Sequence, residues 1–132
     1  MSGKEQDFIK EAFDTNWVVP LGPNVNAFEK SLQDFLIENG KLKIENEGKQ
    51  VVALSAGTAA LHLGLILLGV QAGDEVICQS FTFCASANPV TYLGATAVFV
   101  DSEEDTWNMN PVLLEEAIRD RIAKTGREPK AI

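Results

Sequence analysis

The sequence predicts an α/β fold with a mostly parallel sheet flanked by helices. From residue 51 onward, short apolar runs alternate with segments of helical periodicity, and the links between them are short. The apolar runs are continuous rather than alternating, which is typical of strands that are buried on both faces. Strand–helix alternation with short links indicates parallel strands joined by covering helices.

Four strands and three helices are expected in this second part of the chain. The expected strands are residues 51–54, 75–79, 96–100 and the beginning of a fourth at 130–132. The expected helices are residues 58–68, 84–93 and 111–124, the last capped by Asn110 and ended by Gly126. Because the fourth strand is unfinished, residues 51–132 are expected to be an incomplete α/β domain. The alternative is a complete small domain with a frayed end.

Residues 1–50 have a different pattern, which predicts a helical segment. Two helices, at about 4–13 and 26–39, are joined by a loop that contains two prolines and a glycine. Asn26 and Glu29 resemble a capping box at the start of the second helix.

Composition excludes several classes of partner. The formal net charge is -8, and the basic residues form no cluster of the kind that binds nucleic acid. The N-terminus has no apolar stretch like that of a signal peptide, and the apolar run at 61–70 is too short for a bilayer. We therefore expect a cytoplasmic protein with no nucleic-acid or membrane partner. Cys78 and Cys84 fit no zinc or redox motif, so both are expected to be small buried side chains, and no metal site is expected.

Residues 54–61, LSAGTAAL, place small side chains between a strand and a helix. The first N–H groups of a helix have no partner within the helix, and the macrodipole is positive there, so a phosphate binds without Lys or Arg. Small side chains allow close approach, and Thr58 adds a hydroxyl donor. The alternative is an ordinary helix start that is capped by Ser55 or Thr58.

Residues 79–88, QSFTFCASAN, follow the next strand. Ligands of open parallel sheets bind outside the carboxyl ends of the strands, so this loop and the small-residue loop emerge at one edge. An aromatic ring here could stack on a flat ligand ring. Phe83 is the candidate, with Phe81 packed inward; the alternative is that both are core residues.

Four segments, in order, resemble a known family. They are residues 17–28 (WVVPLGPNVNAF), 55–61 (SAGTAAL), 81–88 (FTFCASAN) and 98–118 (VFVDSEEDTWNMNPVLLEEAI). Together they are similar to the N-terminal part of pyridoxal-phosphate-dependent sugar aminotransferases of the DegT/StrS type.

The resemblance implies the N-terminal part of the large domain of the aspartate-aminotransferase fold. It also implies pyridoxal phosphate as cofactor, with Gly57, Thr58 and Ala59 at its phosphate and Phe83 on its pyridine ring. Trp17 and the loop at Gly22 would lie on the substrate side of residues 1–50. The substrates would be an amino-acid donor, usually glutamate, and a keto nucleotide-sugar used in polysaccharide biosynthesis. Such enzymes are usually homodimers, so a homo-oligomer is expected.

The family's Schiff-base lysine has no counterpart in this chain, so no catalytic residue is assigned. None of the lysines lies in a matching segment or in a cofactor loop: Lys4, Lys10, Lys30, Lys41, Lys43, Lys49, Lys124 and Lys130. We expect the chain alone to be inactive. A sugar dehydratase of the same cofactor class that lacks the lysine, or a non-catalytic oligomerising module, are the alternatives. Asp101 and His62 are expected to be structural, and the acidic run at 101–105 a solvated loop.

Overall fold

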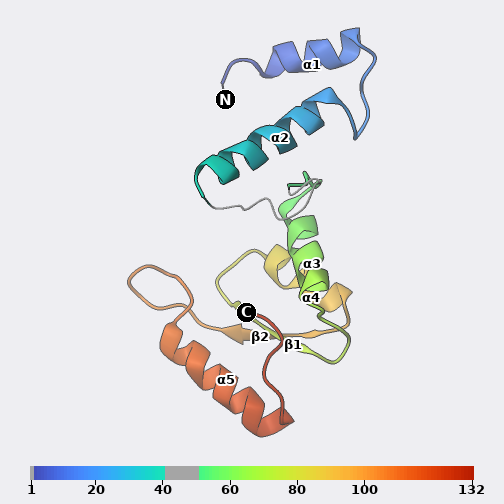
Figure 1. Cartoon of the computed structure of the whole chain (residues 1–132). Helices are drawn as coiled ribbons and strands as arrows, with labels where there is room; N and C mark the ends of the chain where they lie inside the picture. Colours follow the sequence, from blue (N-terminus) through green and yellow to red (C-terminus); the bar gives the residue numbers. More distant parts are fainter. Residues whose placement is uncertain (1, 41–50) are drawn as a thin grey trace. The chain divides into compact units, whose positions relative to one another are not determined.

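The computed structural model describes residues 2–40 and 51–132. Residues 41–50, for which the sequence predicts a polar, exposed stretch, lie outside the described residues. The chain divides into two compact units, Met1–Ala53 and Leu54–Ile132, which are described separately (Figure 1). Of the described helices, none has the length and apolar content needed to cross a bilayer.

The described residues of the first unit form two helices, α1 (Glu5–Asp14) and α2 (Pro23–Glu38). Helix α2 begins three residues earlier than expected, with Gly22 as its N-cap and proline in the first turn. A proline fits there because its fixed φ is helical and its missing N–H would have no helical partner.

Glu29 takes a role that the sequence pattern does not indicate. Asn26 lies inside α2, so the expected capping box is wrong. The Glu29 side chain is instead buried, with the residue 6% exposed, and its carboxylate accepts a hydrogen bond of 2.9 Å from the backbone N–H of Ala53. A buried carboxylate is tolerated only when its oxygens are hydrogen-bonded, so this contact fixes the end of the first unit to α2.

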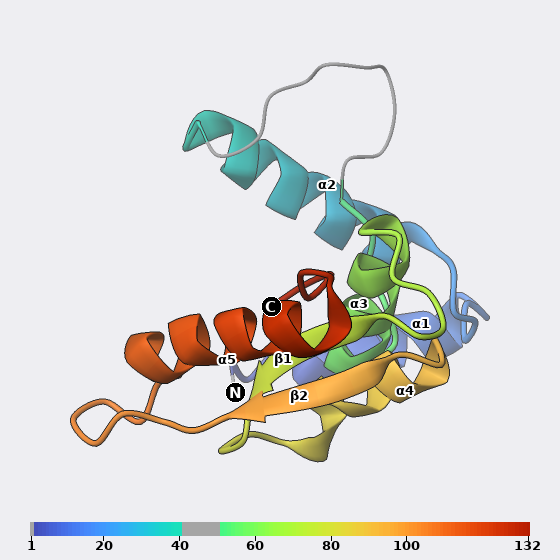
Figure 2. The same ribbon diagram turned by 90° about the horizontal axis from the view of Figure 1, so that it is seen from below.

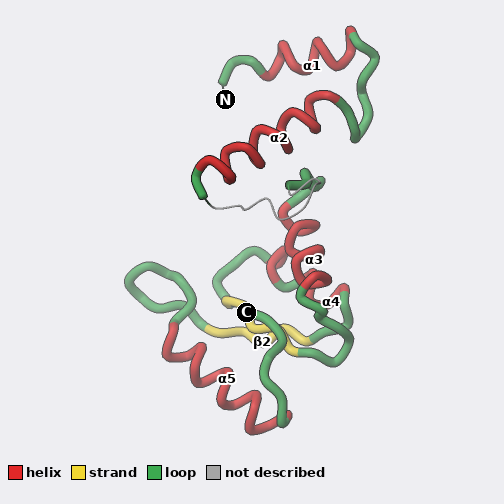
Figure 3. The backbone as a smooth tube through the Cα atoms, viewed as in Figure 1, coloured by secondary structure: helices red, strands yellow, loops and turns green. Residues whose placement is uncertain are grey.

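The second unit contains the α/β part of the chain (Figure 3). Its elements are α3 (Gly57–Leu67), β1 (Glu75–Gln79), the 3₁₀ turn η1 (Cys84–Ser86), α4 (Asn88–Tyr92), β2 (Thr96–Val100) and α5 (Pro111–Thr125). Helix α5 is capped as expected, because the Asn110 side-chain oxygen accepts from the N–H groups of Val112 and Leu113 at 2.9 and 3.2 Å. Gly126 ends it in the left-handed conformation.

Strands β1 and β2 are parallel, with Glu75 opposite Thr96. On the other edge of β1, Ala131 forms a parallel bridge with Val76, so the expected fourth strand begins here as a single bridge. The N–H of Ile77 donates to the carbonyl of Ala131 at 2.9 Å. Helices α4 and α5 lie on opposite faces of the strands, the arrangement that right-handed crossovers give (Figures 1 and 2).

Two elements expected from the sequence differ in the structure. Residues 51–54 form no strand, because a strand needs a hydrogen-bonded neighbour and none is present among the described residues. The helix expected at 84–93 is divided into η1 and α4. Pro89 explains the division, because it has no N–H to continue a helix from the preceding turn.

The core of the second unit is small. Val70, Val76, Val90 and Ala95 form its buried cluster, where helices α3 and α4 meet the strands. The expectation that both cysteines are buried is wrong for Cys84, which lies exposed on η1, while Cys78 on β1 is half-buried.

Candidate functional site

The start of α3 is an uncapped helix N-terminus. Its N-cap, Ala56, is extended and offers no side-chain oxygen, and no side chain accepts a hydrogen bond from the first turn. The N–H groups of Ala59 and Ala60 bond to the Ala56 carbonyl. Those of Gly57 and Thr58 have no acceptor among the described residues. The alternative of a cap by Ser55 or Thr58 is therefore wrong, and two donors remain for a ligand.

The space in front of this helix start is open. A Cβ placed on Gly57 would meet no atom within 4 Å, so the space in front of the backbone is open. The helix dipole contributes positive potential here, and His62 is the one Lys, Arg or His residue in residues 51–118 of the sequence. Gly57, Thr58 and Ala59 are the first helical residues of α3, and their expected role at a cofactor phosphate stays a prediction.

The turn after β1 presents two aromatic side chains to solvent. Phe83 is 85% exposed and Phe81 is 65% exposed, so the alternative that both are core residues is wrong, and so is the inward packing expected for Phe81. No described element covers this end of the strands, which explains why neither ring is buried. A hydrogen bond of 2.9 Å between the hydroxyls of Thr82 and Ser86 holds the turn.

Helix α3 and the turn after β1 line one hollow, but Gly57, Thr58, Ala59 and Phe83 are not among its lining residues. Ala60 and Leu61 contribute from α3, and Thr82 and Ser86 from the turn, to a space of about 370 Å³. The Phe83 ring lies at the surface beside this region, next to Phe81 and Thr82. The hollow thus connects α3 with the turn after β1, but the structure does not bring the predicted phosphate residues and Phe83 into one pocket.

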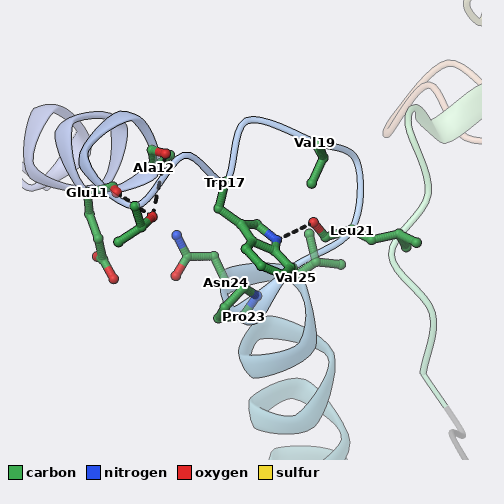
Figure 4. A pocket seen from close by; sticks show the side chains of 10 residues that line it. Glu11, Ala12, Trp17, Val19, Leu21, Pro23, Asn24 and Val25 are labelled. Atoms are coloured by element: carbon green, nitrogen blue, oxygen red, sulfur yellow. Dashed lines mark hydrogen bonds between the residues drawn. The ribbon is translucent and has the colours of Figure 1, made fainter.

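Trp17 organises the loop of the first unit (Figure 4). Its indole Nε1 donates to the carbonyl of Leu21 at 2.6 Å, and the ring lies against Gly22. This loop and the ends of α1 and α2 enclose a space of about 140 Å³. The residues expected on the substrate side therefore contact one another within the first unit.

The side chains expected to be structural have structural contacts. His62 packs edge-on against Tyr92, with ring centroids 5.5 Å apart. The Asp101 carboxylate accepts from the hydroxyl of Ser80 and the N–H of Ser102. In residues 2–40 and 51–132, no group of acidic, His and Cys side chains is placed to hold a metal.

Sequence reasoning missed the roles of Gln79 and Trp107. The Gln79 amide donates to the Ser102 hydroxyl at 2.8 Å and to the Trp107 carbonyl at 2.6 Å, which ties the loop after β2 to the end of β1. Trp107 has a φ of +62°, and its ring lies 5.3 Å from that of Phe81. The sequence feature that could have indicated the role of Trp107 is the tryptophan itself, because the rest of its loop is polar.

The whole chain matches one protein family. Residues 1–132 match the DegT/DnrJ/EryC1/StrS aminotransferase family. A pyridoxal phosphate-dependent aminotransferase by name, EpsN of Bacillus subtilis (strain 168), is 50% identical over 100% of this chain and 31% of its own length. GDP-perosamine synthase of Caulobacter vibrioides is 40% identical over 92% of this chain and 30% of its own.

A solved structure agrees with the sequence matches. The DegT DnrJ EryC1 StrS aminotransferase from Brucella abortus aligns with a TM-score of 0.79 and 37% identity, over 96% of this chain and 31% of that one. The chain thus spans about three tenths of the length of these relatives, and the aminotransferase fold expected for its α/β part is confirmed. The chain belongs to the DegT/DnrJ/EryC1/StrS aminotransferase family, whose members depend on pyridoxal phosphate.

Proposed function

We propose that this chain is the N-terminal part of an enzyme that moves an amino group, from glutamate, to a keto carbon of a nucleotide-linked sugar. The family assignment and the relatives named above support the reaction class. The observation that supports a cofactor role for these residues is the uncapped start of α3, with two free N–H donors.

The role of α3 in this proposal is to hold the cofactor phosphate. Gly57 and Thr58 donate their N–H groups, Thr58 adds its hydroxyl, and the small side chain of Ala59 leaves the approach open. Bound pyridoxal phosphate supplies the electron-accepting ring on which amino transfer depends. Phe83 is exposed and free to lie against that ring.

The proposal also assigns the chain no catalytic lysine. Lys4, Lys10, Lys30, Lys124 and Lys130 are the lysines of the described part, and none lines a hollow at the carboxyl end of the strands. We propose that amino transfer needs residues beyond these 132. Cytoplasmic location and a homo-oligomer belong to the same proposal.

Titration of the chain with pyridoxal phosphate, followed by borohydride reduction and intact mass, tests the lysine assignment. We expect reversible binding and no stoichiometric adduct, because the cofactor is held by its phosphate alone. A saturable adduct on one mapped lysine would show that the chain has a working Schiff-base site.

The phosphate role has a matched pair of variants. Thr58→Val removes the hydroxyl donor, and a hydrogen bond to a charged phosphate of about 1.5 kcal/mol corresponds to roughly tenfold weaker binding. Thr96→Val makes the same change at the opposite end of the strands and should leave the affinity unchanged. Equal affinities for the two variants would remove α3 from the cofactor site.

The transfer itself is tested on the full-length gene product. Purified enzyme with L-glutamate and pyridoxal phosphate should release 2-oxoglutarate and leave the cofactor aminated, and a keto nucleotide-sugar should restore the starting spectrum. Release of water from the sugar without any 2-oxoglutarate would favour the dehydratase alternative.

A further inference from the structure

The carboxamide of Gln79 holds two points of the loop that follows β2. Its Nε2 donates to the Ser102 hydroxyl at 2.8 Å and to the Trp107 carbonyl at 2.6 Å. Gln79 is the last residue of β1, so the end of this strand is joined to a loop that lies 23 to 28 residues further along the chain. Both bonds come from one amide nitrogen, which has two N–H donors, so a single substitution removes them together.

Trp107 is the residue of this loop that most needs support. Its φ of +62° costs a bulky residue free energy and persists only where the surroundings impose it. The second Gln79 bond falls on the carbonyl of this residue, and the antiparallel bridge between Ser102 and Met109 closes the loop around it. Loss of the Gln79 amide should therefore release the backbone at Trp107, while β1 and β2 keep the hydrogen bonds of their own ladder.

The Trp107 ring contacts the turn that follows β1. Its centroid lies 5.3 Å from that of Phe81 at an interplanar angle of 48°, within the range in which aromatic pairs attract. The start of this turn is joined to β2, because the Ser80 N–H donates to the Val100 carbonyl at 2.9 Å. The packing of Phe81 on Trp107 extends this attachment past Ser80, toward the part of the turn that bears Phe83.

We propose that Gln79 is a positioning residue for the Phe83 ring. It acts through the contact between Trp107 and Phe81. Phe83 follows Phe81 by two residues and lines the same surface hollow, so the place of its ring depends on how the turn is held. The inference rests on the role proposed above for Phe83 at the pyridine ring of the cofactor. A displaced ring loses stacking energy, because attraction between flat rings depends on their distance and offset.

A double-mutant cycle on the full-length gene product tests this role. The apoenzyme is titrated with pyridoxal phosphate, and the dissociation constant is read from the absorbance of the bound cofactor. Phe83→Ala removes the stacked ring and should weaken binding roughly two- to tenfold, the range of one aromatic pair. Gln79→Met keeps the length of the side chain and removes both donors. It should weaken binding by no more than Phe83→Ala does, and it should add nothing in the double variant, because it acts through that ring.

Gln71→Met is the matched control. It makes the same change at an exposed residue in the turn before β1, at the opposite end of the strand, and should leave the dissociation constant unchanged.

A measurement without cofactor follows the link itself. The sequence has two tryptophans, so the indole N–H of Trp107 gives one of two such resonances in the ¹⁵N-labelled chain. Gln79→Met and Phe81→Leu should each move this resonance, whereas Phe83→Ala should not. Phe81→Leu leaves the bonds of β1 intact, so it tests the link even if Gln79→Met does not fold. Its effect on cofactor affinity should also vanish in the Phe83→Ala background.

The outcomes separate this inference from the proposed function. Unchanged cofactor affinity in Phe83→Ala would overturn the proposed stacking and the positioning role with it. If Phe83→Ala weakens binding, the positioning role alone is overturned by normal affinity in both Gln79→Met and Phe81→Leu, or by losses that persist in full without the Phe83 ring. An unmoved Trp107 resonance in folded Gln79→Met would also overturn it, since the amide would then not hold the loop.

Discussion

Replacement of Gly22 by alanine should open the loop of the first unit. A Cβ on Gly22 would lie 1.8 Å from Nε1 and 2.2 Å from Cδ1 of Trp17, far inside van der Waals contact. The indole would have to leave, and its hydrogen bond to the Leu21 carbonyl would be lost. Glycine is required at this position because it lets the tryptophan ring lie directly against the chain.

The cost has two parts. Gly22 has φ +156° and ψ -179°, a region that is essentially restricted to glycine, and a side chain there costs about 1–3 kcal/mol. Loss of the indole hydrogen bond adds about 0.5–1.5 kcal/mol. Little packing energy is lost in addition, because Trp17 is already 50% exposed. The free energy of opening the loop should therefore fall by about 2–4 kcal/mol.

Hydrogen exchange of the Trp17 indole N–H measures this opening. In Gly22→Ala the indole should exchange at the rate of a free tryptophan, and its resonance should move to the solvent-exposed position. Gly64→Ala is the matched control, because Gly64 lies inside α3 with open space around its Cα, and it should leave the Trp17 signal unchanged. A protected indole in Gly22→Ala would refute the reasoning, since the two groups cannot occupy the same space.

Three further changes have outcomes that the structure fixes. Asn110→Ala removes the cap of α5 and should destabilise the second unit by about 1 kcal/mol in urea unfolding followed by circular dichroism. Val90→Ala removes two methyl groups from a site that is 1% exposed and should cost about 2 kcal/mol in the same assay, with the exposed Val112→Ala near zero. Hydrogen bonds from the Thr106 hydroxyl and the Asp105 N–H lower the pKa of Glu103, so its stabilisation of the loop is complete above the ordinary glutamate pKa and is lost as the pH falls through the lowered value. The Trp107 resonance should report that loss on acid titration, and Glu103→Gln should abolish its pH dependence.

The parallel strands could be predicted because their signals are local. Residues 75–79 and 96–100 each have an apolar centre and a glycine turn before them, and both are strands with those bounds. Both ends of α5 could be predicted equally well, because Asn110 and Pro111 are typical of a helix start and Gly126 of a helix end.

The remaining elements depend on contacts that a local pattern does not contain. Residues 51–54 are as apolar as the true strands, but pairing depends on a neighbour elsewhere in the chain. Glu29 looked like a capping residue, because its bond to Ala53 spans 24 residues.

The candidate site likewise has one part that a local pattern predicts and one part that it does not. The start of α3 was recognisable because a run of small residues before a helical pattern leaves the first backbone N–H groups of the helix accessible. The exposure of Phe81 was not, since an aromatic side chain after a buried strand is usually core.

The two cysteines give a last prediction, which tests the hollow beneath α3. Cys78 lies on β1 in that hollow and is half-buried, and burial raises the pKa of its thiol, while Cys84 is exposed on η1. The thiolate is the reactive form, so Cys84 should react with a maleimide or an aromatic disulfide at pH 8 much faster than Cys78.

Single-cysteine variants separate the two rates. Cys78→Ser should keep the fast phase and Cys84→Ser the slow one, and mild urea should accelerate only the slow phase as the hollow opens. Comparable rates for both thiols in native buffer would mean that α3 does not shield β1 in solution. The hollow that Ala60 and Leu61 of α3 share with Cys78 would then be more open in solution than the structure shows.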